Sequence, residues 1–440
     1  MSKTSLSGFP EWLPEGRIVE NYVLEKIRQG FELHGFANIE TRAVEPVSEL
    51  LRKGETSKEI YLLRRLQEDP VKAAEDPRQI GLHFDLTVPF ARYVLENRAR
   101  LNFPFKRYQI QKVWRGERPQ DGRFREFTQA DIDIVGDGEL PFFHEVEVAV
   151  VMARVLSSLP LPPVHIRVNN RKIVQGYCEA LGIENVEGAL RALDKLDKIG
   201  PGGVASEMEE LSFSTKAQEK LLQMAQIKGD GSTVRSRIQE LQVSSELLEQ
   251  GLDELTQLLD QASRRVPGLV QADLSIARGL DYYTGTVYET TVEGHENLGS
   301  ICSGGRYDSL ATDGKRTYPG VGMSIGVSRL VSRIISGELA TASRKVPSAV
   351  LVAVTNEEHR EDSNKVADAL RERGICADTA PKAAKFGKQI KAADQRGIPY
   401  VWFPDSSEVK NIITGEQVQA DPLSWKPDEQ YLVPQVTANN

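Results

Sequence analysis

The chain has 440 residues, enough for two to four domains that each bury a core. Hydrophobic residues make up 40% of it and charged residues 27%, a balance that excludes a disordered chain. No apolar run is long enough to cross a bilayer and the first residues lack a signal-peptide pattern, so we expect a cytoplasmic protein with no membrane partner. The net charge of −8 argues against non-specific binding of nucleic acid, although it leaves room for a local basic strip.

The first predicted element is an amphipathic helix. It follows Pro14, its apolar residues recur at helical spacing from Ile18 to Phe31, and Gly35 is the expected helix stop. An extended segment is expected from Asn38 to Pro46. The three cysteines and six histidines farther along are scattered and form no paired metal-binding spacing, so we expect reduced thiols and no structural metal.

A long hairpin is predicted next, with strands at 105–116 and 125–135 joined by a polar loop. Basic residues concentrate here, because the stretch from Arg98 to Arg125 has nine Lys and Arg residues against two acidic ones. A bound polyanion would explain such a strip, and so would an ordinary solvated basic face.

The middle of the chain changes character between Arg171 and Asp273, where the only aromatic residues are Tyr177 and Phe213. Leu and Ile at helical spacing indicate a helical insertion at 171–268. It splits a first domain into two parts, 1–170 and 269–338, the second with strand signals at 270–292 and glycines at 299–305.

The stretch from Ser336 to Pro347 has the composition of a linker. After it, the region 346–440 alternates apolar runs with helical segments, which predicts a small α/β domain with a largely parallel sheet. The apolar runs are 349–354, 375–377 and 399–403, and the helical segments are 361–373 and 385–396.

The second hairpin strand carries the strongest chemical signal. Strand side chains alternate between faces, so Ala130, Ile132 and Ile134 face a core. The opposite face then presents an aromatic ring, an amide and two carboxylates: Phe127, Gln129, Asp131 and Asp133. Two interpretations are open: this face lines a concave binding site, or it is an ordinary solvent-exposed strand face. Arginines close to it in the fold would favour the binding site. The candidates are Arg115, Arg278 and Arg329.

The common short motifs of nucleotide binding and catalysis give little evidence of function in this sequence. The glycines at 320, 322 and 326 miss the dinucleotide-binding spacing, and no phosphate-binding loop occurs. Gly322–Gly326 matches the nucleophile elbow of serine hydrolases, with Ser324 as nucleophile. We disfavour that reading because the only later histidine, His359, falls in the predicted second domain.

Together these segments resemble the class II aminoacyl-tRNA synthetases, and specifically the histidyl-tRNA synthetase family. The helix with Asn38–Pro46 is similar to the dimer-forming motif 1, Phe105–Gly136 to motif 2 and Gly320–Leu330 to motif 3. Arg278–Gly285 resembles a signature peculiar to the histidine enzymes, supported by Gly304–Asp308. The resemblance covers nearly the whole chain.

The resemblance implies an α+β fold: an antiparallel-sheet catalytic domain interrupted by the helical insertion, then an α/β anticodon-binding domain. It implies a homodimeric ligase that activates L-histidine with ATP and Mg²⁺ to histidyl-adenylate and transfers histidine to the 3′ end of histidine tRNA.

It also implies roles for single residues. Histidine would be bound by Asp85, Thr87, Gln129, Asp133, Tyr282 and Tyr283. ATP would be bound by Arg115, Glu117, Arg123, Phe127 and Arg329. Arg278 and Arg115 would be catalytic, gripping the carboxylate and the α-phosphate. Mg²⁺ would come with ATP, since no protein motif for a metal is present.

Two segments depart from the family pattern: Gly8–Pro14, where Arg-Gly-Thr-x-Asp is more usual, and Pro404–Val409, which is shorter and less glycine-rich. The competing reading is a non-catalytic synthetase-like protein such as the regulatory subunit of ATP phosphoribosyltransferase. Such relatives typically lack the intact histidine signature and the last domain, and this chain has both.

Overall fold

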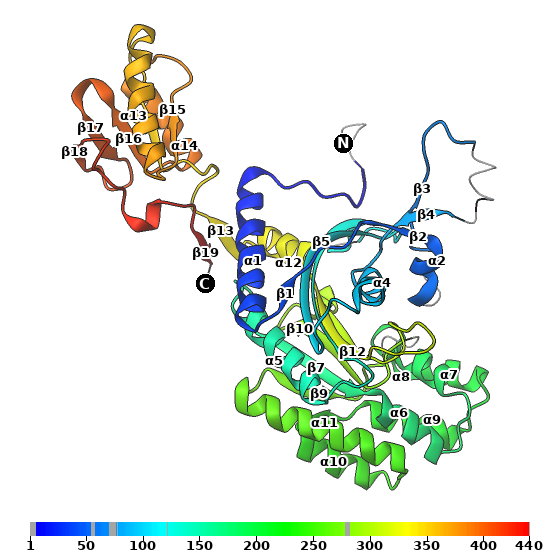
Figure 1. Ribbon diagram of the computed structural model, residues 1–440. Coiled ribbons are helices and arrows are strands. Elements are labelled where there is room, and N and C mark those ends of the chain that lie inside the picture. The colour runs from blue at the N-terminus through cyan, green and yellow to red at the C-terminus, as the bar shows by residue number, and fades with distance from the viewer. Residues whose placement is uncertain are drawn as a thin grey trace. The chain divides into compact units, whose positions relative to one another are not determined.

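The computed structural model describes residues 6–53, 58–69, 76, 78–120, 122–277 and 282–439. The chain divides into two compact units (Figure 1). The first comprises Met1–Pro10 and Val23–Ser332, and the second comprises Glu11–Tyr22 and Arg333–Asn440. No helix in the described residues is both long and apolar enough to span a membrane.

The first unit is built on a mixed sheet that has nine strands within the described residues. All neighbouring strands are antiparallel except β1 with β5 and β7 with β9. Their order across the sheet is β1 (Ala37–Asn38), β5 (Phe105–Trp114), β6 (Glu126–Val135), β12 (Gly320–Gly326), β11 (Cys302–Tyr307), β10 (Thr286–Val292), β7 (Val164–Asn170), β9 (Val270–Asp273) and β8 (Lys228–Gly229). The α+β fold class and the predicted hairpin are both confirmed.

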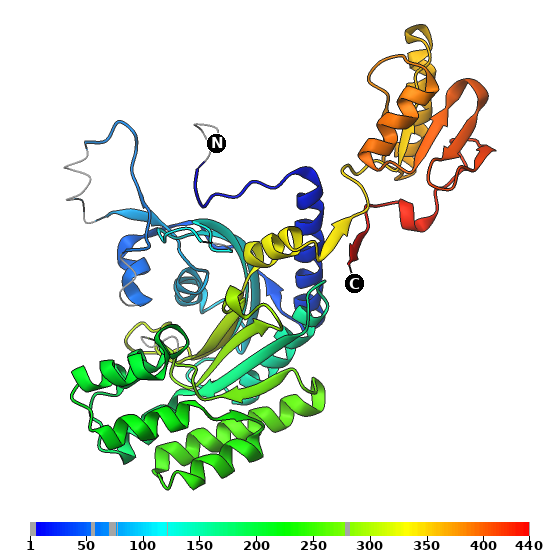
Figure 2. The same cartoon turned by 180° about the vertical axis from the view of Figure 1, so that it is seen from behind.

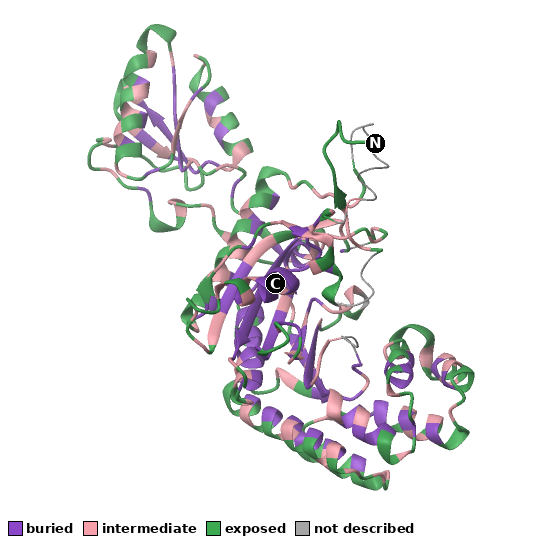
Figure 3. Ribbon diagram, turned by 45° about the vertical axis from the view of Figure 1, so that its right-hand side comes forward, coloured by how far each residue is buried: buried purple, intermediate pink, exposed green. Residues whose placement is uncertain are grey.

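Helices cover one face of this sheet. α5 (Phe143–Ser157) is buried along most of its length and packs on β6, β7 and β12. The predicted first helix is α1 (Pro14–Leu33), and its Phe31 packs on Tyr108 of β5 with ring centroids 5.8 Å apart. The central strands are among the most buried parts of the chain (Figure 3). This packing leaves the opposite face of β5, β6 and β12 for polar residues.

On that opposite face, α4 (Thr87–Asn97) covers one end of the strands. Phe90 and Val94 of α4 pack with Val135 and Tyr307. Beside α4 lies a small sheet with the strand order β2 (Val44–Pro46), β4 (Ile80–Leu82) and β3 (Leu62–Leu63). In the chain, β2 leads directly into the helix α2 (Val47–Leu50) and the 3-10 turn η1 (Leu51–Lys53).

The middle of the chain is helical, as predicted, and its helices lie beside β7 and β9 (green in Figure 2). They are α6 (Arg171–Ala180), α7 (Val186–Leu193), α8 (Leu196–Glu210), α9 (Thr215–Ala225), α10 (Gly231–Glu240) and α11 (Glu246–Arg265). Five of these helices have an N-cap residue whose side chain accepts a hydrogen bond from a backbone N–H of the first turn: Asn170, Asn185, Ser214, Asp230 and Ser245. The segment also adds the short strand β8 to the edge of the main sheet, which the helical pattern did not predict, whereas β9 falls in the stretch 270–292 where strands were predicted.

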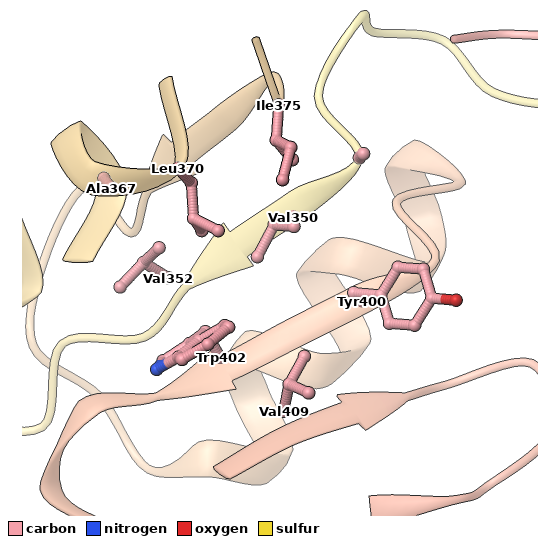
Figure 4. Packing of buried hydrophobic residues seen from close by; sticks show 9 residues of the cluster. Val350, Val352, Ala367, Leu370, Ile375, Tyr400, Trp402 and Val409 are labelled. Atoms are coloured by element: carbon pink, nitrogen blue, oxygen red, sulfur yellow. The ribbon is translucent and has the colours of Figure 1, made fainter. Parts of the chain in front are cut away.

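The second unit contains a sheet in the order β15 (Ala377–Thr379), β14 (Val350–Val352), β16 (Tyr400–Phe403), β17 (Glu408–Asn411) and β18 (Gln417–Gln419). The first three strands are parallel, and α13 (Arg360–Glu372) and α14 (Phe386–Arg396) lie close to the predicted helices. Figure 4 shows Leu370 and Trp402 in the core between α13 and the sheet. The antiparallel β17 and β18 were missed because their residues are mostly polar.

The stretch predicted as a linker is partly structured. Ala340–Ala342 forms β13, which pairs antiparallel with β19 (Val436–Ala438) near the end of the chain. The linker prediction is therefore wrong for these residues. Small side chains leave strand pairing to backbone hydrogen bonds, so composition does not reveal a strand whose partner is about a hundred residues away.

Candidate functional site

Two adjoining hollows open on the polar face of β5, β6, β11 and β12. The first has a volume of about 130 Å³ and is lined by Asp85, Thr87, Arg115, Gln129, Asp131, Asp133, Tyr282, Tyr283, Ser303, Gly304, Tyr307, Gly322, Met323 and Ser324. The second has about 310 Å³ and is lined by Arg115, Glu117, Gly122, Arg123, Phe124, Phe127, Gln129, Gly299, Ser300, Ile301, Cys302, Ser303, Ser324, Gly326 and Arg329. Because four residues border both, the two hollows form one site.

Asp133 forms the floor of the first hollow. One carboxylate oxygen accepts a hydrogen bond from the hydroxyl of Tyr307 at 2.7 Å, and the other pairs with Arg107 at 2.5 Å. Register explains the ion pair, since Arg107 lies directly across from Asp133 in the β5–β6 ladder. On the other side the partner is Gly322, where any Cβ would clash with the carboxylate.

A hydrogen-bonded chain lies beside this floor. The Gln129 amide nitrogen donates to the Ser324 hydroxyl at 2.6 Å, and that hydroxyl donates to the Asp131 carboxylate. Desolvation by burial raises the pKa of Asp131 to about 7, with a further upward contribution from the charge of Asp133 and a downward one from Arg107. The side chain is therefore close to changing its charge at neutral pH.

The walls of the first hollow come from α4 and from the segment before β10. Asp85 accepts a hydrogen bond from the Val88 backbone N–H at 3.0 Å, which ties its carboxylate to the start of α4. Tyr282 and Tyr283 stand together with ring centroids 4.1 Å apart. Burial raises the pKa of Tyr282, so its phenol stays neutral. The Tyr283 ring lies over Gly305, where a Cβ would come within 2.7 Å of it.

The second hollow is lined by arginines around one aromatic ring. The Arg115 guanidinium lies 5.1 Å from the Phe127 ring centroid and donates to the Phe84 carbonyl at 2.9 Å. Glu117 faces both Arg115 and Arg123, at 3.9 and 3.7 Å. Arg329 donates to the Gly122 carbonyl at 3.0 Å and to that of Ser300. This combination of cations and a flat ring suits an anion that carries an aromatic base.

The amino-terminal segment borders the hairpin loop. The Gly8 carbonyl accepts hydrogen bonds from the backbone N–H groups of Arg125 and Glu126, at 2.7 and 3.1 Å. The φ of Gly8 is +87°, and a Cβ there would lie 2.8 Å from Pro119. Despite its departure from the family pattern, this segment therefore braces the loop that carries Glu117 and Arg123.

The predicted site residues thus gather at one place. Those that line the first hollow are Asp85, Thr87, Arg115, Gln129, Asp133, Tyr282 and Tyr283, and those that line the second are Arg115, Glu117, Arg123, Gln129, Phe127 and Arg329. Arg278 lies outside the described residues. No role was predicted for Arg107, Tyr307 or Ser303, and Asp131 was noticed only through its place on the strand face.

The serine-hydrolase reading finds no support in this geometry. Ser324 lies within β12, not at a strand-to-helix turn, and the partners of its hydroxyl are Asp131 and Gln129. No histidine is among the described residues that line either hollow. Ser324 therefore lacks the base that a nucleophilic serine requires.

Comparison with known proteins gives a consistent picture. The histidyl-tRNA synthetase family model matches residues 8–330, and the anticodon binding domain model matches residues 349–420. A histidine–tRNA ligase of Micrococcus luteus is 55% identical, with 99% of this chain and 98% of that protein covered. One of Bifidobacterium animalis is 56% identical, with the same shares covered. The crystal structure of histidyl-tRNA synthetase from Nostoc superposes with a TM-score of 0.83 at 35% identity, covering 96% of this chain and 97% of that one.

Proposed function

Since the chain belongs to the histidyl-tRNA synthetase family, we propose that it is a histidine–tRNA ligase that activates L-histidine with ATP and transfers it to histidine tRNA. The observation that carries this proposal is the pair of adjoining hollows that share Arg115. One hollow is small and is lined by carboxylates and tyrosines, which suit the α-ammonium group and the imidazole ring of histidine. The other is larger and suits a nucleotide.

In the first hollow, Asp133 and Tyr283 bind the imidazole, because a carboxylate and a phenol together satisfy two ring nitrogens. Asp85, Thr87 and Gln129 bind the α-ammonium group, with Tyr282 completing the wall. This assignment places the substrate carboxylate toward Arg115, at the border with the second hollow.

In the second hollow, Phe127 and Arg329 hold the adenine between a ring and a guanidinium plane. Glu117 contacts the edge of the base, and Arg123 contacts the terminal phosphate. Arg115 and Arg278 bind the substrate carboxylate and the α-phosphate, where charge develops as the carboxylate oxygen attacks phosphorus and pyrophosphate leaves. Positioning and charge neutralisation supply most of the rate acceleration in such a reaction.

Magnesium belongs to this proposal as a companion of ATP. Mg²⁺ prefers oxygen ligands and is often held by one or two carboxylates plus substrate phosphates. Among the described residues that line the second hollow, Glu117 alone has a carboxylate. We therefore expect the ATP phosphates and water to provide most of the ligands, and the ion to neutralise phosphate charge.

The second unit is proposed to bind the anticodon region of the tRNA, because residues 349–420 match the anticodon binding domain model. The same observation argues against the regulatory-subunit reading, since a protein that only binds histidine has no use for such a domain. Charging of tRNA for protein synthesis makes the cytoplasm the expected location.

We also propose a homodimer. Apolar side chains are exposed on the small sheet and the turn beside it, in the stretch of chain that follows the segment similar to motif 1: Leu51, Leu62, Leu63 and Ile80. Leu62 is 60% exposed, and apolar side chains gathered on one surface mark a place for association with another protein surface. Sedimentation should give the mass of a dimer, and Leu62→Glu should shift it toward the monomer.

Exchange of labelled pyrophosphate into ATP tests the central proposal. Purified protein with magnesium should catalyse exchange that depends on histidine and not on other amino acids, and it should then charge histidine tRNA. Absence of exchange by folded protein would favour the regulatory-subunit reading, and exchange with another amino acid would refute the specificity.

A further inference from the structure

We propose that Asp131 and Ser324 are positioning residues that set the orientation of the Gln129 amide, so that its carbonyl oxygen faces the α-ammonium group of the bound amino acid. The inference rests on the proposed function, in which Gln129 binds that group. Neither Asp131 nor Ser324 needs to touch the substrate's reacting atoms. Their effect passes through the hydrogen bonds that join the three side chains.

The three side chains meet because of strand register. Ser324 on β12 is the direct neighbour of Asp131 on β6, and Gln129 lies two residues along β6 on the same face. All three border the first hollow. Asp131 is 2% exposed and Gln129 is 7% exposed, and Ser324 is partly buried. Bulk water therefore competes little for their hydrogen bonds.

The direction of the chain follows from what each group is able to donate. An ionised carboxylate only accepts hydrogen bonds, so the single hydroxyl proton of Ser324 goes to Asp131. The Ser324 oxygen is then left to accept, which requires the NH₂ end of Gln129, and the two lie 2.6 Å apart. A glutamine amide has two ends of nearly the same shape, and this chain selects one of its two orientations.

The selected orientation leaves Gln129 Oε1 buried and without a hydrogen-bond partner among the described residues. An unpaired buried acceptor is unfavourable, and a bound ammonium group removes that cost by donating to it. The reverse orientation would direct an NH₂ group at a cation. The Asp131–Ser324 pair therefore favours binding of the amino acid without contacting it.

The arrangement depends on the charge of Asp131. When this carboxyl is protonated it is able to donate to Ser324, whose proton is then free to go to Gln129 Oε1, and the amide no longer has one preferred orientation. Burial raises the pKa of Asp131 to about 7, so the change falls near neutral pH. The charged and titratable groups around it are Arg107 on β5, Asp133 on β6, Cys302 on β11, Asp85 and Tyr282. Burial raises the pKa of Cys302 and that of Tyr282, which keeps both neutral there.

The test measures pyrophosphate exchange with histidine and ATP varied separately. Ser324→Ala and Asp131→Asn should each raise the KM for histidine about tenfold, the effect of losing one hydrogen bond to a charged group, while the KM for ATP stays within about twofold. The double variant should be little worse than either single one, because both interrupt the same chain. Ser363→Ala removes another buried serine hydroxyl, in the second unit, and should change neither constant.

The pH profile of kcat/KM for histidine separates positioning from a structural role. Wild-type protein should lose kcat/KM as the pH falls through about 7, because the protonated form of Asp131 increases. Asp131→Asn should show only the titration of histidine itself. Ser324→Thr keeps the hydroxyl, so it should retain most of the histidine affinity that Ser324→Ala loses.

Equal losses for histidine and ATP, additive effects in the double variant, or the same pH profile in Asp131→Asn as in wild type would each overturn the inference. The proposed function fails separately, because it predicts histidine-dependent exchange by the wild-type protein whatever the variants do.

Discussion

Arg107 and Asp133 face each other across the β5–β6 ladder and form an ion pair of 2.5 Å, with the arginine side chain fully buried. The guanidinium lies 4.3 Å from the ring centroid of Phe90, which closes it off from solvent. Its Nε and Nη1 atoms find no hydrogen-bond partner in the described residues. Asp133 is thus held at the floor of the first hollow by a buried cation whose charge also acts on Asp131, two residues away on the same strand.

Breaking this pair should cost far more than breaking one at the surface. Arg107→Met leaves a buried carboxylate without its counter-ion, for which the usual loss is about 3–5 kcal/mol in the free energy of unfolding. Urea denaturation of the purified variant measures it. The control is Arg28→Met, which removes an exposed arginine paired with Glu25 and should change stability little. Equal effects of the two changes would contradict the buried pairing.

Amino-acid selection is predicted to depend on Asp133 and Tyr283. A site with buried polar groups rejects ligands that leave those groups unpaired. Asp133→Asn and Tyr283→Phe should each raise the KM for histidine by about ten- to a hundredfold, with a much smaller effect on the KM for ATP. Steady-state exchange assays give both constants, and parallel losses for the two substrates would indicate a general disturbance of the fold instead.

Nucleotide binding is predicted to depend on the Phe127 ring. Stacking of a base on an aromatic side chain contributes about 1–3 kcal/mol, so Phe127→Leu should raise the KM for ATP by about tenfold or more. The KM for histidine should hardly change, because Phe127 borders only the second hollow. Phe143→Leu, an exposed phenylalanine at the start of α5, serves as the control. An unchanged KM for ATP would remove Phe127 from the adenine site.

The site shows which parts of the structure the sequence pattern was able to predict. Period-two alternation places Gln129, Asp131 and Asp133 on one face of a strand without any knowledge of its neighbours. No role was predicted for Arg107 or Tyr307, because their importance comes from the register and order of other strands, which no local pattern specifies. The same limit explains β13, whose partner strand lies near the end of the chain.

Binding of tRNA is predicted to involve a row of exposed lysines in the first half of α14 and just before it: Lys382, Lys385, Lys388 and Lys391. Replacing all four with alanine should weaken tRNA charging and reduce its salt dependence, because each phosphate contact contributes about 0.7–0.9 to the slope of log affinity against log salt. Pyrophosphate exchange should be unaffected. Lys365→Ala, an exposed lysine of α13, is the matched control, and full charging by the fourfold variant at every salt concentration would exclude these lysines.

The last prediction concerns Arg278, which lies outside the described residues and is assigned by its place in the signature Arg278–Gly285. Of the described residues on either side of it, Ala277 is buried and Tyr282 lines the first hollow. The resemblance to that signature implies that its guanidinium binds the attacking carboxylate and the α-phosphate. Loss of one such preorganised donor costs about 2.7–4 kcal/mol, or a hundred- to a thousandfold in rate.

Arg278→Ala should therefore fold normally, bind histidine with modest loss and nearly stop adenylate formation in a single turnover. Arg278→Lys should rescue only part of the rate, because a point charge does not reproduce a guanidinium that donates to two oxygens at once. An arginine that merely braces its turn, paired for example with Asp281, predicts something different: the alanine variant would lose stability, and its folded fraction would form adenylate at a near-normal rate. Measuring the unfolding midpoint and the single-turnover rate on the same preparation decides between the two roles.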